Sequence, residues 1–285
     1  MSIECEKWLD SNKFETPLLV LDLDEVTRSY KRIINAFKNI EVLYAIKANP
    51  SREIIITLNK LGSSFDAASL SEIKTCLELG VNPKKISYGN SIKKSRDILK
   101  AYELGIKSFV FDCEEELNKI FFNAPNADIF CRVKVSNNGS EWPLSKKFGC
   151  ELEKTEYLIS KSRKLNLNLK GLSFHVGSQQ TNPNAWNKAL KKISIIYKKL
   201  NSAGLYLDSL NIGGGFPIDY STKQKEIESF SSVIKDSLEE YFAGVKPKNI
   251  YMEPGRYLVG KAGIIEAEVV LVTKRNKMDN INVNK

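Results

Sequence analysis

The sequence predicts an α/β protein whose main part is a (β/α)8 TIM barrel. Short apolar runs rich in β-branched and aromatic residues alternate with longer segments of helical periodicity. This alternation is typical of a parallel sheet with right-handed crossovers. Eight such repeats occur without a low-complexity linker between them. They favour a closed barrel over an open doubly wound sheet, which remains the alternative.

The strands and helices of the predicted barrel can be assigned in chain order. After an opening apolar run at Leu18–Leu23, the eight candidate strands are Val42–Ile46, Ser64–Ala67, Lys85–Tyr88, Ser108–Phe111, Asp128–Val135, Gly171–His175, Ser209–Ile212 and Asn249–Met252. Ser69 is expected to cap a helix that has an acidic first turn and ends at Gly80. A long amphipathic helix is expected over Ala185–Ala203, and another is marked by Phe230, Val233, Ile234 and Leu238.

The two ends of the chain are predicted to belong to a second, β-rich domain. A ninth strand-like run, Ile264–Thr273, follows the eighth barrel strand and would suit a strand sharing a sheet with Leu18–Leu23. A polar tail, Lys274–Lys285, comes after it. We therefore expect an N-terminal strand segment of this β-domain at residues 1–23, the barrel at 24–262, and the start of a C-terminal β-domain at 263–285, so that only fragments of the β-domain are present.

The composition excludes several classes of protein. The 285 residues include 43 basic and 34 acidic ones, for a net charge of +9, but the lysine pairs are scattered and form no stripe. We therefore expect a solvated surface and no nucleic-acid partner. No apolar run could span a membrane, and the acidic, mixed N-terminus is no signal peptide, so a cytoplasmic protein is expected. The five cysteines, none in a C-x-x-C pair, should be reduced and mostly buried, and a single histidine predicts no metal site.

Polar residues and glycines recur where the predicted strands end. In a barrel, chemistry gathers at the C-terminal ends of the strands. Any one of these residues could be a simple cap, but their joint placement on one rim favours a functional site. In chain order they are Lys47, Asp66, Tyr88-Gly89-Asn90, Asp112, Arg132, His175, Ser178, Gly213-Gly214-Gly215, Glu253, Gly255 and Arg256.

Three of these side chains suggest distinct chemistry. Lys47 leaves an apolar strand, so partial desolvation should favour its neutral amine. A neutral amine is a nucleophile that can form a Schiff base with an aldehyde. Alternatively, the Lys47 side chain reaches solvent. Glu253 beside a pyridine nitrogen would keep that nitrogen protonated and make the ring an electron sink; alternatively it is a helix-terminal or surface carboxylate. His175 could stack on a cofactor ring or be a core histidine.

An anion site is expected after the seventh and eighth strands, where barrels commonly hold a phosphate. The glycines Gly213, Gly214 and Gly215 let backbone N–H groups approach an anion without a Cβ in the way. Gly255 and Arg256 add backbone donors and a guanidinium fork, and Ser178 adds a hydroxyl. The alternative for the glycines is a tight turn between strand and loop.

Together these segments resemble the fold-type III pyridoxal-phosphate decarboxylases, the ornithine/diaminopimelate/arginine decarboxylase family. The motifs match in order and spacing from Thr16 to about Val272. They are Tyr44-Ala45-Ile46-Lys47-Ala48-Asn49, Phe65-Asp66-Ala67-Ala68-Ser69, Ser173-Phe174-His175-Val176-Gly177-Ser178, Asn211-Ile212-Gly213-Gly214-Gly215-Phe216-Pro217 and Glu253-Pro254-Gly255-Arg256-Tyr257. The resemblance implies a barrel of the alanine-racemase-like type, pyridoxal 5'-phosphate as cofactor and a homodimer.

The resemblance also implies roles for the residues on the rim. Lys47 corresponds to the lysine that forms the Schiff base, His175 stacks on the pyridine ring and Glu253 pairs with its nitrogen, so these three are the expected catalytic residues. Asp66 and Arg132 resemble residues near the cofactor. The residues expected to hold the phosphate are Ser178, Gly213, Gly214, Gly215, Gly255 and Arg256.

The substrate implied by the resemblance is a basic amino acid, first of all L-ornithine, converted to putrescine in polyamine biosynthesis. The segments 65–69 and 141–149 resemble the ornithine and the bacterial lysine/ornithine decarboxylases. Family members continue into a C-terminal β-domain with a Cys-Asp motif and a tyrosine near the phosphate, whereas this chain stops at Lys285. A truncated chain with an incomplete dimer interface is therefore expected.

Two other functions stay open. One is a non-catalytic homologue or fragment that binds the cofactor and pairs with a full-length subunit. The other, which is weaker, is a diaminopimelate decarboxylase or a racemase-like barrel. Racemase-like relatives usually place arginine near the pyridine nitrogen, so Glu253 counts against that function.

Overall fold

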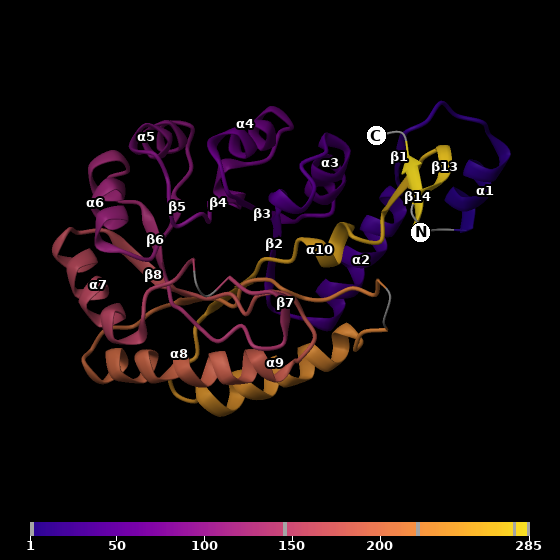
Figure 1. Cartoon of the computed structure of the whole chain (residues 1–285). Helices are drawn as coiled ribbons and strands as arrows, with labels where there is room; N and C mark the ends of the chain where they lie inside the picture. Colours follow the sequence, from indigo (N-terminus) through magenta and orange to yellow (C-terminus); the bar gives the residue numbers. More distant parts are fainter. Residues whose placement is uncertain (1–2, 145–146, 221–222, 276–277, 284–285) are drawn as a thin grey trace.

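Eight parallel strands close into a barrel at the centre of the molecule (Figure 1). The computed structural model describes residues 3–144, 147–220, 223–275 and 278–283. The barrel strands follow one another in chain order, and β11 pairs with β2 to close the ring. They are β2 (Glu41–Ala45), β3 (Ser64–Ala67), β4 (Ile86–Tyr88), β5 (Ser108–Phe111), β6 (Asp128–Arg132), β8 (Asn168–Ser173), β10 (Ser209–Asn211) and β11 (Asn249–Met252). The predicted TIM barrel is thus confirmed, with each of the eight expected strands in it.

Helices surround the barrel, as Figure 1 shows. In α4 the hydroxyl of Ser69 accepts a hydrogen bond from the Glu72 N–H, so the predicted cap is confirmed. The expected long helix is α8, which ends one residue before the predicted boundary. The helices are α2 (Leu23–Ala36), α3 (Arg52–Lys60), α4 (Leu70–Glu78), α5 (Ser95–Glu103), α6 (Glu114–Asn123), α7 (Leu152–Lys164), α8 (Asn184–Ser202), α9 (Ile227–Tyr241) and α10 (Arg256–Val259), with 3-10 turns at η1 (Ile46–Ala48) and η2 (Pro83–Lys85).

An aromatic cluster in the core supports the loop that follows β10. The ring of Trp186 on α8 stacks on Phe216 with a centroid distance of 4.8 Å, and Phe230 on α9 meets Trp186 edge-on at 5.6 Å. The indole N–H of Trp186 also donates to the carbonyl of Ile212 at 3.2 Å. Because all three rings are fully buried, this cluster fixes both ends of the glycine segment between residues 212 and 216.

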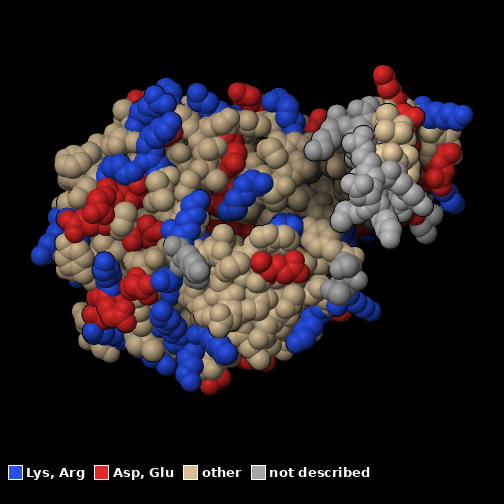
Figure 2. Space-filling view, viewed as in Figure 1, with Lys and Arg blue, Asp and Glu red and all other residues tan. Residues whose placement is uncertain are grey.

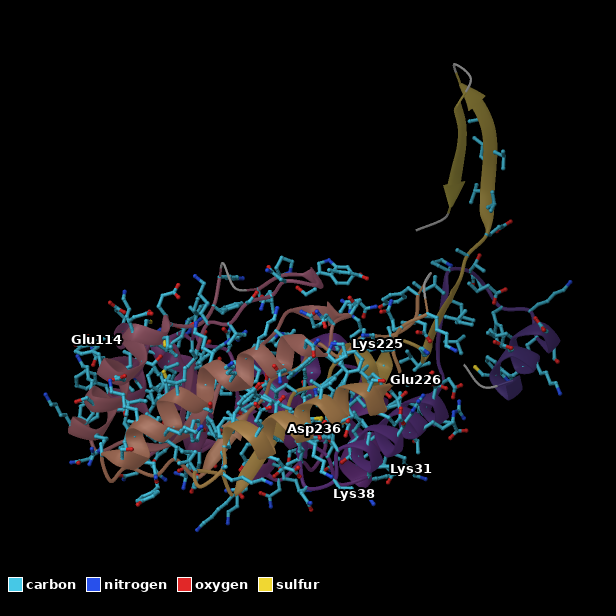
Figure 3. The ribbon with its side chains drawn as sticks, turned by 90° about the horizontal axis from the view of Figure 1, so that it is seen from below. Lys31, Lys38, Glu114, Lys225, Glu226 and Asp236 are labelled. Atoms are coloured by element: carbon cyan, nitrogen blue, oxygen red, sulfur yellow. The ribbon has the colours of Figure 1, made fainter. Side chains whose placement is uncertain are left out.

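Outside the barrel, the strands at the two ends of the chain pair with each other. β1 (Leu18–Leu21) is antiparallel to β12 (Gly263–Glu266), which confirms the predicted shared sheet. The single run expected at Ile264–Thr273 is wrong, because the chain leaves this sheet after β12 and starts β13 (Val269–Arg275). β13 pairs with β14 (Met278–Val283), so the predicted polar tail contains a strand. This hairpin stands away from the barrel (Figures 1 and 3). The division into domains stays a prediction.

Other features of the described residues bear on partners and compartments. A short helix, α1 (Ile3–Ser11), begins the described chain, and β7 (Ser140–Trp142) pairs with β9 (Ser178–Gln180) as a separate two-stranded sheet. Figure 2 shows acidic and basic side chains interspersed over the face in view. In the described part of the chain, no helix is both long and apolar enough to cross a membrane. The five cysteines are free thiols, and three of them are buried.

Candidate active site

Lys47 and Asp66 meet at the C-terminal rim of the barrel. Lys47 lies in η1, directly after β2, and its Nζ is 3.6 Å from Oδ2 of Asp66 on the neighbouring strand β3. The Asp66 side chain is only 3% exposed, whereas the Lys47 side chain is 56% exposed. Of the two alternatives for Lys47, this exposure favours the side chain that reaches solvent, because the 3-10 turn places Lys47 beyond the apolar strand.

The other oxygen of Asp66 is buried without a hydrogen-bond partner among the described residues. Gly89, which follows β4, makes room for it, because a Cβ on Gly89 would lie 1.8 Å from Oδ1 of Asp66. A buried carboxylate oxygen without a donor is costly. The site therefore offers an acceptor that a bound group with an N–H or O–H could satisfy.

Glu253 follows β11 and faces the same centre. Its Oε1 accepts a hydrogen bond of 2.6 Å from the side-chain amide of Asn211 at the end of β10. The pKa of Glu253 is raised to about 7, mainly by burial and also by the charge of Asp66, against the opposing effects of Lys47, Arg132 and Asn211. A carboxylate with such a pKa is well suited to share a proton with a weakly basic ring nitrogen.

His175, which follows β8, is held in one orientation. The backbone N–H of Gly177 donates to Nδ1 of His175 at 2.9 Å, so Nδ1 carries no proton. Burial lowers the pKa of His175 well below 6.5, and the positive charges of Arg132 and Lys47 lower it further. The imidazole is thus neutral at pH 7, and it presents an uncharged aromatic face to the site.

The glycine run after β10 packs directly against these residues. A Cβ on Gly214 would lie 2.2 Å from the carbonyl oxygen of Glu253 and 3.5 Å from Nε2 of His175. Gly213 has a φ of 66°, in the left-handed region that favours glycine. The three successive glycines are therefore required by the close approach of two strand ends, and of the three only Gly215 is partly exposed.

Arg256 and Ser178 lie beside this glycine run. Gly255 is the N-cap of α10, and Arg256 is its first residue. The Arg256 guanidinium donates from Nε to Oγ of Ser178 at 3.4 Å and from a terminal nitrogen to the Tyr220 hydroxyl at 2.7 Å. Its Cζ also lies 4.4 Å from the ring centroid of Trp142. These contacts orient a cation beside the glycine run, as an anion site requires.

Arg132 also lies at this rim, whereas the side chains of Asp112 and Asn90 hold rim loops together by hydrogen bonds. Arg132 ends β6, and its guanidinium lies 4.9 Å from the ring centroid of Phe148. Asp112 accepts hydrogen bonds from the hydroxyl of Ser91 at 2.7 Å and from the Gly149 N–H at 2.8 Å. The Asn90 amide binds the carbonyl of Ala68, so it also ties loops together.

Sequence reasoning assigned no role to several residues of the site. Asn211 had a usable signal, because it is a polar residue at a strand end like the others, but it was noted only as part of the glycine motif. Trp142 and Tyr220 carried no such signal, since both are exposed aromatic residues and neither directly follows a barrel strand. Ser145 and Lys146, within the segment noted for its resemblance, lie outside the described residues.

The eleven predicted site residues lie on one rim, and their chemistry fits a phosphorylated aldehyde with a ring nitrogen. The site contains an amine, a partly buried carboxylate, a neutral imidazole, an arginine beside glycine backbone and an unsatisfied buried carboxylate oxygen. In agreement with this chemistry, residues 23–260 match the sequence family described as "Pyridoxal-dependent decarboxylase, pyridoxal binding domain". The chain belongs to this family. The predicted cofactor class, pyridoxal phosphate, is thereby confirmed at the level of the family.

Curated proteins similar to the chain include ornithine and lysine/ornithine decarboxylases. The chain is 33% identical over 256 residues to an ornithine decarboxylase of Neurospora crassa, a match of 90% of this chain and 52% of the relative. It is 32% identical to a lysine/ornithine decarboxylase of Selenomonas ruminantium, over 91% of this chain and 66% of the relative. The chain thus spans about half to two thirds of the length of the curated relatives it matches.

Solved structures of the family share the fold. The lysine/ornithine decarboxylase of Vibrio vulnificus, complexed with putrescine, matches with a TM-score of 0.89 and 31% identity, over 99% of this chain and 76% of that one. The Selenomonas ruminantium lysine decarboxylase matches with a TM-score of 0.90 and 30% identity, over 100% of this chain and 74% of that one. The fold of these decarboxylases therefore agrees with the barrel described above.

Proposed function

We propose that this chain binds pyridoxal 5'-phosphate at the barrel rim and serves in the decarboxylation of a basic amino acid, first of all L-ornithine to putrescine. The observation that carries the proposal is the convergence of Lys47, Glu253 and Arg256 around one glycine run. An amine, a carboxylate with a pKa near neutrality and an oriented guanidinium are the three groups that an aldehyde, a ring nitrogen and a phosphate need.

Each group of the cofactor then has a partner in this chain. Lys47 supplies the amine for the aldehyde, and the accessible position of its side chain leaves that amine free to react. The phosphate binds between the Arg256 guanidinium, the Ser178 hydroxyl and the backbone of the glycine run. His175 offers its neutral face to the ring, and Glu253 offers its carboxylate to the ring nitrogen.

The bound cofactor would supply an electron-poor ring that takes up the electron pair left when the amino acid loses its carboxylate as carbon dioxide. Glu253 holds a proton at the ring nitrogen, because a carboxylate favours the cation. His175 stays neutral and so does not oppose that positive charge. Asp66 lies 3.6 Å from Nζ of Lys47, so it would stabilise the ammonium form of a Lys47 side chain that is not bonded to the cofactor.

The identity of the substrate rests on the relatives. Three curated relatives with about 33% to 35% identity are ornithine decarboxylases, and the Vibrio vulnificus structure holds putrescine. An arginine decarboxylase of a Chlorella virus, at 25% identity, has the same fold. Carbon dioxide and diamine should therefore be measured with L-ornithine, L-lysine and L-arginine, each with the wild type and with Lys47→Ala. Release from L-ornithine that depends on Lys47 supports the proposal, whereas the absence of any cofactor binding overturns it.

A second candidate is a non-catalytic chain that binds the cofactor and pairs with a full-length subunit. One observation favours keeping it: one relative, 34% identical, is the antizyme inhibitor 2 of Xenopus laevis. Cofactor binding without carbon dioxide release, together with formation of a mixed dimer with a full-length decarboxylase in native mass spectrometry, would favour this candidate over the first.

A further inference from the structure

Three hydrogen bonds form a closed ring between the ends of β10 and β11. The side-chain amide of Asn211 donates to Oε1 of Glu253 at 2.6 Å. The backbone N–H of Gly213 donates to Oδ1 of Asn211 at 2.9 Å. The backbone N–H of Glu253 donates to the carbonyl of Gly213 at 2.9 Å. Each of these three residues therefore binds the other two.

The orientation of the Asn211 amide has only one consistent assignment. If its oxygen and nitrogen were exchanged, the NH2 group would face the N–H of Gly213, and the oxygen would face the carboxylate of Glu253. The contact with Gly213 would be repulsive at any pH, and the contact with Glu253 whenever its carboxylate is charged. The Asn211 side chain is 4% exposed, so water cannot compensate for a wrong orientation. The glycine run thus dictates that a donor points at Glu253.

We propose that Asn211 is a positioning residue, which joins the glycine run to Glu253 and holds the Glu253 carboxylate where the cofactor's ring nitrogen binds. This inference rests on the function proposed above. The glycine run carries the backbone that we assign to the phosphate, so the ring of hydrogen bonds couples the two ends of the cofactor site. A shift of Gly213 would move Asn211, and with it the carboxylate.

The charges around Glu253 make this donor important. Asp66 on β3 disfavours the carboxylate form, as does burial, whereas Lys47 in η1 and Arg132 on β6 favour it. Lys47 is exposed, and Arg132 lies against Phe148. Asn211 is the neutral group that binds the carboxylate directly, and a hydrogen bond to the charged form favours that form.

The substitution Asn211→Asp separates the two hydrogen bonds of the Asn211 side chain, one to Glu253 and one from Gly213. The new carboxylate can still accept the Gly213 N–H, but it cannot donate to Glu253, and it adds a like charge. Asn211→Ser also removes the donor without adding charge, in case the first variant does not fold. Asn249→Asp is the matched control, because Asn249 begins β11 at the opposite end of the barrel and its side-chain amide donates a 3.4 Å hydrogen bond to Ser209.

The titration of Glu253 can be followed in the full chain without cofactor by carbon-13 NMR of labelled glutamate carboxyls, with Glu253→Gln identifying the signal. In Asn211→Asp the midpoint should rise by about one pH unit or more, as expected for a like charge in contact. In Asn211→Ser it should rise less, and in Asn249→Asp it should not change. Identical midpoints in all four proteins would overturn the proposal.

A cofactor titration separates this proposal from the proposed function. Wild-type chain that binds no pyridoxal 5'-phosphate would refute the function, while the NMR result would still report on Asn211 and Glu253. If the wild type binds, Asn211→Asp should bind about tenfold more weakly and with an altered visible spectrum, in the same direction as Glu253→Gln. Unchanged affinity and spectrum in both Asn211 variants, when Glu253→Gln changes them, would overturn the positioning role.

Discussion

The ammonium of Lys47 lies 3.6 Å from a carboxylate oxygen of Asp66, and the two side chains differ sharply in exposure, at 56% and 3%. The charge of Asp66 also raises the pKa of Glu253. Asp66 therefore acts on both the amine and the carboxylate of the site from a buried position.

The effect of Asp66 on Glu253 can be tested with Asp66→Asn. The substitution removes a negative charge with little change of shape, so the titration midpoint of Glu253 should fall below its value of about 7 in the wild type. Carbon-13 NMR of the Glu253 carboxyl would measure it. Asp112→Asn is the control, since Asp112 binds Ser91 and Gly149 instead. A midpoint that moves equally in both variants would contradict the account.

The raised pKa of Glu253 also predicts how stability depends on pH. Between pH 4.5 and about 7 the folded chain holds a proton on Glu253 that the unfolded chain has lost, so this group makes stability fall as the pH rises. Glu253→Gln removes the effect. In urea denaturation, the free energy of unfolding of Glu253→Gln minus that of the wild type should therefore increase from pH 5 to pH 8.

The control for this comparison is Glu239→Gln, a substitution of an exposed glutamate on α9. Its difference from the wild type should stay constant over the same pH range. If Glu253→Gln behaves like the control, Glu253 has an ordinary carboxyl environment in the folded chain, and its proposed role loses its physical basis.

The glycine run should tolerate no side chain at Gly214. Because a Cβ there would lie 2.2 Å from the backbone oxygen of Glu253, Gly214→Ala must displace one of the two strand ends. We expect a loss of stability of about 1–3 kcal/mol and at least tenfold weaker binding of pyridoxal 5'-phosphate. Gly244→Ala, with a φ of 77° and open space around it, should cost about 1 kcal/mol and leave cofactor affinity unchanged.

A buried ion pair supports the loop that carries Gly89. Lys93 and Glu116 lie 2.9 Å apart with side chains 0% and 2% exposed, and burial lowers the pKa of Lys93 to about 8. Glu116→Ala leaves this ammonium without its carboxylate and should destabilise the chain by about 3–5 kcal/mol. Glu103→Ala, which breaks an exposed pair with Lys100, should cost less than about 1 kcal/mol. Equal losses in thermal denaturation would contradict this assignment.

The alternation of apolar runs and helices was enough to predict the barrel, because strand ends such as Lys47, Asp66 and Glu253 fall at the same edge once the strands are parallel. The sequence left open whether Lys47 is desolvated or reaches solvent, since its exposure depends on the 3-10 turn after β2. The β13–β14 hairpin was missed because its second strand is polar and lacks the apolar pattern of a buried strand. The contacts of Arg256 with Trp142 and Tyr220 join segments far apart in the sequence, and no local pattern reports them.

The central claim is that Lys47 carries the cofactor. The chain should be loaded with pyridoxal 5'-phosphate, reduced with borohydride to make the bond to the amine permanent, digested and analysed by mass spectrometry. The account predicts one modified peptide, with the added mass on Lys47, and none in Lys47→Arg. Modification at another lysine, or at none, would contradict it.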